Sequence, residues 1–162
     1  MPAGSAGAGG SAVIEAYVLA WEVQGRLRAA SAHATRHAFH PPGLVGPIGS
    51  AVASAKILGL GFPGGPAVER TALEGDAAAV PLPRPMVGSG EPHFSFAGLK
   101  SAVLRAYDSG KYETADIAAS FQQAAVDCVT DRLRITLANM TDVDTLVVAG
   151  GVAANATVRG AL

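Results

Sequence analysis

Two glycines and an asparagine follow an apolar run close to the end of the sequence. The segment LVVAGGVAAN spans residues 146–155 and contains Gly150, Gly151 and Asn155. Glycines placed after a buried strand let a ligand approach the backbone without a Cβ atom in the way, and a following helix N-terminus offers free N–H donors. The pattern suits a nucleotide. A strand-to-helix turn that needs a positive φ is the alternative explanation.

A second glycine pair occurs in the segment PGGPAVER. Gly64 and Gly65 precede a predicted short helix, and Glu69 lies about one turn into that helix. A carboxylate in this position can accept two hydroxyl hydrogen bonds from a ribose. The alternative is a solvated glutamate that complements the dipole of its own helix.

The segment HATRH carries a histidine pair with metal-binding spacing. His33 and His37 are four residues apart, so both imidazoles would face the same way on a helix and could share a metal ion. The HExxH pattern is absent and no third ligand is evident. Chance placement in an alanine-rich helix is therefore the favoured interpretation.

The composition is typical of one globular domain. The chain has 162 residues, of which 49% are hydrophobic and 15% charged, and its formal net charge of −1 excludes a generally basic nucleic-acid clamp. Cys128 is the single cysteine, which rules out an internal disulfide and a cysteine-based zinc cluster. No apolar run reaches the roughly 20 residues that span a bilayer, so a cytoplasmic protein without membrane contact is expected.

Periodicity and turn residues predict a helix-rich chain with one clear strand near residues 144–149. Residues 80–92 are proline-rich and are expected to be extended. The expected helices cover residues 12–38, 51–61, 67–75, 96–110, 114–140 and the stretch after Asn155. In the longest helix, one apolar face is predicted to hold Ile117, Phe121, Ala124, Cys128, Leu133 and Leu137.

Four segments together resemble one known family, the TsaD/Gcp family. These proteins are threonylcarbamoyl transferases acting on tRNA adenosine, once catalogued as M22 glycoprotease-like proteins. The resemblance covers residues 53–162 and divides the chain into an unmatched Ala/Gly-rich segment, 1–50, and a partial Gcp-like domain, 51–162. The segments are, in order, AKILGLGFPGGPAVER, VPLPRPM, FSFAGLKSAVLR and LVVAGGVAANATVR.

The resemblance implies an α/β fold of the actin-like, Hsp70-like ATPase (ribonuclease H-like) type. It also implies transfer of threonylcarbamoyl from threonylcarbamoyl-AMP to the adenosine next to the anticodon of ANN-decoding tRNAs. An iron or zinc ion positions the donor in the family, and ATP is a second nucleotide ligand to consider. The implied partners are tRNA, a paralogous actin-fold subunit and a small ATPase.

The family pattern assigns roles to several residues. Its donor-binding asparagine falls on Asn155, its substrate-contacting glycine on Gly65, and the acidic residue one turn later on Glu69. Gly64 joins Gly150 and Gly151 as a nucleotide-loop glycine. The resemblance identifies no catalytic residue.

The sequence also departs from the family. Val52 occupies the position of a family aspartate, and the Gly-rich phosphate loop has no counterpart. His33 and His37 have the spacing of the family's HxxxH metal motif but lie too close to AKILGL, so poor metal binding is expected. A truncated member that is inactive alone is the leading expectation. The alternatives are a binding or regulatory remnant that pairs with family partners and a metalloprotease. Loss of a lobe would expose sheet edge and apolar surface, so a homodimer is a further expectation.

Overall fold

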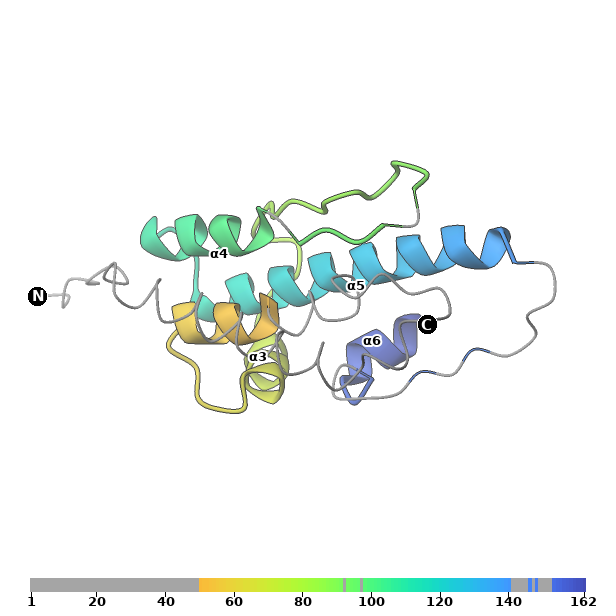
Figure 1. Ribbon diagram of the computed structural model, residues 1–162. Helices are drawn as coiled ribbons and strands as arrows, with labels where there is room; N and C mark the ends of the chain where they lie inside the picture. Colours follow the sequence, from red (N-terminus) through yellow and green to blue (C-terminus); the bar gives the residue numbers. More distant parts are fainter. Residues whose placement is uncertain (1–49, 92, 97, 141–145, 147, 149–152) are drawn as a thin grey trace, which may run out of the picture.

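The described part of the chain consists of helices that gather around one long helix. The computed structural model describes residues 50–91, 93–96, 98–140, 146, 148 and 153–162. A helix covers residues 50–57. The labelled helices after it are α3 (Gly64–Ala72), α4 (Leu99–Asp108), α5 (Thr114–Ala138) and α6 (Ala156–Ala161). Helices α3, α4 and α6 all contact α5, which runs through the middle of the described part (Figure 1).

Each helix predicted over described residues is present, but several bounds differ from the prediction. Helix α3 begins at Gly64, so the glycine pair expected to precede it forms its first turn, and it ends at Ala72 instead of near residue 75. Helix α4 is shorter than the predicted range 96–110. Gly59 and Gly110 end two of the helices with positive φ angles of 69° and 63°, a conformation that glycine adopts without strain. The strand is not confirmed, because Leu146 and Val148, the described residues of 144–149, belong to no strand. The predicted helix over 12–38 lies outside the described residues.

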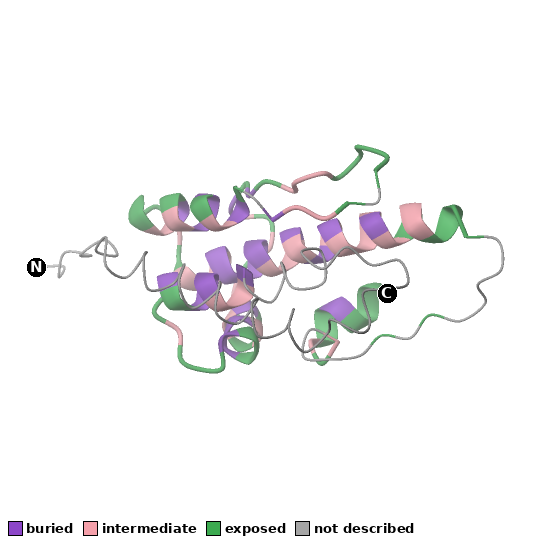
Figure 2. Ribbon diagram, viewed as in Figure 1, coloured by how far each residue is buried: buried purple, intermediate pink, exposed green. Residues whose placement is uncertain are grey.

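Helix α5 buries one face along most of its length, as the apolar spacing predicts. Ile117 and Ala124 are completely buried, and Cys128 is 2% exposed. The prediction that this face continues to Leu137 is wrong, since Leu137 is 37% exposed. The buried face instead continues from Cys128 to Arg132, one helical turn further on, and the last residues of α5 are exposed (Figure 2).

The turn after α3 packs directly on the first turns of α5. Asp76 donates its backbone N–H to the Asp116 carboxylate at 2.8 Å, and Val80 donates its N–H to the Ser120 hydroxyl at 3.1 Å. At Gly75 a Cβ atom would lie 2.1 Å from a backbone carbonyl oxygen of α5. Only glycine fits there, so this residue permits the close approach of the two segments.

Arg132 fixes the following irregular segment to the same helix. Its side chain is 1% exposed. The guanidinium donates to the Met86 carbonyl at 2.6 Å and the Ser89 hydroxyl at 2.9 Å, and also to the Glu91 carbonyl and the Asp131 carboxylate. The hydrogen bond from Arg132 lowers the pKa of the Asp131 carboxyl. A buried guanidinium is tolerated here because its N–H groups find partners.

Substitution Arg132→Met should therefore lower the free energy of unfolding by about 3 kcal/mol, because the segment 86–91 loses the buried charged donor that holds it on α5. Urea denaturation of the whole chain measures the change. Arg134 is exposed on the same helix, and Arg134→Met should stay within about 0.5 kcal/mol of the wild type. Equal effects of the two substitutions would contradict the assigned role of Arg132.

Cys128 is buried, as the helical pattern predicts. Its thiol donates to the Pro85 carbonyl across 3.7 Å, so it also helps to hold the extended segment on α5. Burial is the main cause that raises the pKa of the Cys128 thiol from its ordinary 9.0 to about 11, and the charge of Asp127 adds to it. The protonated thiol is thus the form that the folded state favours.

This pKa shift makes stability depend on pH in the alkaline range. Between pH 9 and about 11 the unfolded thiol has lost its proton while the folded thiol keeps it. The contribution to stability is therefore complete below pH 9 and disappears as the pH rises through about 11. Wild-type stability should fall more steeply than that of Cys128→Ala across this window in urea denaturation. Parallel pH profiles for the two proteins would show that the thiol is not responsible.

Candidate functional site

Glu69 reaches the N-terminus of a helix far along the chain. Its carboxylate oxygen accepts the backbone N–H of Ala156, the first residue of α6, at 2.7 Å. The two residues are 87 positions apart in the sequence. Glu69 thus complements the positive end of α6 rather than the dipole of its own helix. The structure places it beside Asn155, the neighbour of Ala156.

Asn155 is the N-cap residue of α6. Its Oδ1 accepts the backbone N–H of Val158 at 2.9 Å, and its Nδ2 donates to the Gln122 side-chain oxygen at 2.8 Å. Gln122 in turn donates to the Thr157 hydroxyl at 3.0 Å. We call the cluster of Glu69, Gln122, Asn155, Ala156 and Thr157 the α3–α5–α6 junction, after the helices that supply it.

The two glycines before Glu69 have different surroundings. Gly64 is buried, and a Cβ atom there would lie 2.9 Å from the Ala55 Cβ and 3.3 Å from the Val52 Cα. Packing of α3 against the helix over 50–57 is sufficient to explain this glycine. Gly65 is exposed, and a Cβ atom there would meet nothing within 4 Å. Of the pair, Gly65 is the glycine with room for a ligand.

This difference predicts opposite outcomes for the same substitution. Gly64→Ala should lower the free energy of unfolding by about 1–3 kcal/mol, because the added methyl group overlaps the neighbouring helix. Gly65→Ala should leave stability unchanged or raise it by up to about 1 kcal/mol, because the unfolded chain loses conformational freedom. Urea unfolding midpoints measured side by side test this. A tolerated Gly64→Ala would refute the close packing at this position.

Several predicted residues cannot be placed. Gly150 and Gly151 lie outside the described residues, and so do the metal candidates His33 and His37. Among the residues that are described, no group of three or more His, Cys, Asp or Glu side chains is arranged to hold a metal ion. The described residues thus do not by themselves supply the ligands of the iron or zinc ion that the resemblance implies.

Two members of the junction, Gln122 and Thr157, were not expected from the sequence. The signal for Gln122 was the pair of amides at 122 and 123, which interrupts the apolar pattern of the longest helix. The two amides have different roles, because Gln123 donates to Asp127 on its own helix at 2.8 Å. Sequence alone could not say which amide faces another element.

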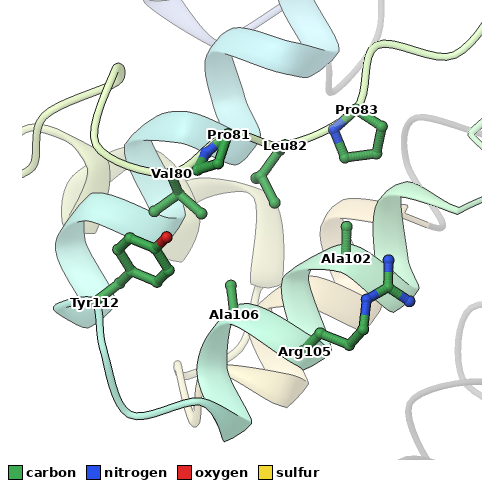
Figure 3. A pocket seen from close by; sticks show the side chains of 8 residues that line it. All are labelled: Val80, Pro81, Leu82, Pro83, Ala102, Arg105, Ala106 and Tyr112. Atoms are coloured by element: carbon green, nitrogen blue, oxygen red, sulfur yellow. The ribbon is translucent and has the colours of Figure 1, made fainter.

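A separate cavity of about 360 Å³ lies between the extended segment and α4. In Figure 3 the side chains of Leu82, Ala102 and Ala106 point into the space between segment and helix, with Tyr112 at one side. Its lining is mainly apolar, and it includes none of the residues of the α3–α5–α6 junction. The cavity therefore does not coincide with the candidate site.

Comparison with known proteins assigns the chain to one protein family. The family model TsaD, described as tRNA N6-adenosine threonylcarbamoyltransferase, matches residues 46–162. Since this match covers more than half of the chain, the protein belongs to the TsaD family. Membership implies the actin-like, ribonuclease H-like fold, and the described residues form a helical part of it.

Curated relatives carry the same description. The chain is 72% identical over 109 residues to the tRNA N6-adenosine threonylcarbamoyltransferase of Erythrobacter litoralis. The matched region covers 67% of this chain and 32% of the relative. It is 73% identical over 110 residues to the protein of that name from Novosphingobium aromaticivorans. This match covers 67% of this chain and 31% of that relative. The chain thus spans about a third of the length of these relatives.

A second family model, the MmgE/PrpD N-terminal domain, matches residues 2–62 and overlaps the start of the TsaD match. It covers less than half of the chain, so it marks a similarity of this region only. Within the part that the structure describes, no helix is both long enough and apolar enough to cross a membrane.

Proposed function

We propose that this protein acts in the biosynthesis of threonylcarbamoyladenosine in tRNA. The reaction would transfer the threonylcarbamoyl group from threonylcarbamoyl-AMP to the adenosine next to the anticodon of ANN-decoding tRNAs. The main support is the 72% identity to a relative that is named for this transfer. Because the proposed substrate is tRNA, we also propose a cytoplasmic location. The proposed partners are a paralogous actin-fold subunit and a small ATPase.

The α3–α5–α6 junction would hold the adenosine part of the donor. Glu69 uses one carboxylate oxygen for Ala156, and its other oxygen has no partner among the described residues. In this proposal, that oxygen accepts a ribose hydroxyl. Asn155 donates one Nδ2 hydrogen to Gln122, and in this proposal the second donates to a ribose or purine acceptor. Gly65 leaves open space beside them.

These residues would contribute by positioning. In the transfer, a bond forms between the N6 atom of the tRNA adenosine and the carbamoyl carbon. The bond from that carbon to the adenylate phosphate oxygen breaks, so AMP leaves with the electron pair and N6 loses a proton. Fixing the adenosine of the donor presents the carbamoyl carbon to the incoming amine, and holding reactants in this way lowers the entropic part of the barrier.

Val52 bears on how tightly the donor is held. It stands where the resemblance places a family aspartate, and its Cα lies 3.3 Å from the position of a Cβ added to Gly64. An aspartate at that position would thus lie close to the predicted nucleotide glycines. Valine offers no acceptor or charge there, so we expect weak nucleotide binding that depends mainly on Glu69 and Asn155.

The proposal is tested by AMP binding to the whole chain, measured by calorimetry. Asn155→Ser keeps a hydroxyl that can cap α6 but removes the amide, so stability should change little while AMP affinity falls about fivefold. Asn139→Ser is the matched control, because Asn139 donates to the Ile135 carbonyl at the exposed end of α5. Absence of saturable AMP binding, or unchanged affinity in Asn155→Ser, would contradict the proposal.

A further inference from the structure

The identity of residue 155 is not explained by capping alone. A serine hydroxyl could accept the Val158 N–H as well as the asparagine oxygen does. Asparagine adds an NH₂ group, and in this structure that group has a defined partner in the Gln122 oxygen at 2.8 Å. The amide plane of Asn155 is therefore held at both ends, by Val158 through its oxygen and by Gln122 through its nitrogen.

Gln122 is itself held in one orientation. Its oxygen faces the Nδ2 donor of Asn155, so its nitrogen is directed to the Thr157 hydroxyl at 3.0 Å. The backbone that carries Gln122 is firmly anchored, since Phe121 is 3% exposed and Ala124 is completely buried. Two amides in series thus connect the core helix α5 to the N-cap of α6.

We propose that Gln122 is a positioning residue of the nucleotide site, which directs the second Nδ2 hydrogen of Asn155 toward an acceptor on the adenosine. This inference rests on the proposed function. Without Gln122 the amide of Asn155 would still cap α6 through its oxygen, but its nitrogen would lose the contact that fixes its direction. Gln122 therefore acts through Asn155 and need not touch the ligand.

Two substitutions separate this role from a general effect on folding. Gln122→Glu keeps an oxygen facing Asn155, and its second oxygen can accept from the Thr157 hydroxyl. Gln122→Met keeps the length of the side chain and loses both hydrogen bonds. Adenosine is the probe, because it is uncharged and is not repelled by the added carboxylate. Its affinity for the whole chain should fall about fivefold in Gln122→Met and stay within about twofold of the wild type in Gln122→Glu.

Gln123→Met is the matched control, because Gln123 bonds only within its own helix to Asp127 among the described residues. It should leave adenosine affinity unchanged. Equal losses in Gln122→Met and Gln122→Glu, or no loss in Gln122→Met, would overturn the inference. If the wild-type chain binds no adenosine, the proposed function fails as well. If binding depends on Asn155 and not on Gln122, only this inference fails.

A second readout follows Asn155 without any ligand. In ¹⁵N–¹H NMR spectra, the two side-chain amide protons of Asn155 should have separate, slowly exchanging signals in the wild type and in Gln122→Glu. In Gln122→Met these signals should shift and exchange faster with solvent. Signals of Asn155 that are the same in all three proteins would show that Gln122 does not orient this amide.

Discussion

The burial of one face of α5 is the constraint on which the rest of the described structure depends. Ile117, Ala118 and Ala124 are completely excluded from solvent, and every labelled helix contacts α5. Removing this apolar face from water is the main driving force available to so small a set of helices. A shift of α5 would therefore disturb α3, α4 and α6 together.

The polar edges of α5 have a second role, because they satisfy backbone groups of segments that lack regular structure. Asp116 and Ser120 accept N–H groups of the turn after α3, and Arg132 donates to carbonyls of the segment 86–91. Partners are separated by 40 to 46 residues in the sequence. Residues 76–91 therefore follow α5 in the same direction. The Val80 N–H is buried and needs a partner, and here a side chain of α5 supplies it.

The same arrangement explains how the α3–α5–α6 junction is formed. Glu69 and Asn155 come from distant parts of the chain, and α5 lies in contact with both of their helices. Gln122 projects from α5 to Asn155, while the residue before it faces the core. One helix thus anchors the fold and orients the polar groups assigned to nucleotide binding. In the proposed function, these groups would serve the threonylcarbamoyl transfer for which the relatives are named.

The sequence by itself determined which described segments are helical, the glycines that end two of the helices and the family to which the chain belongs, but not the first residue of α3 or α4. These features depend on local periodicity, on turn residues and on the order of motifs, all of which can be identified from the sequence. The strand near 144–149 stays a prediction. Only the tertiary structure decided that Arg132 is buried, that Gly64 is packed while Gly65 is open, and that Glu69 meets Ala156. Contacts between residues tens of positions apart arise from tertiary packing, and local sequence patterns do not predict them.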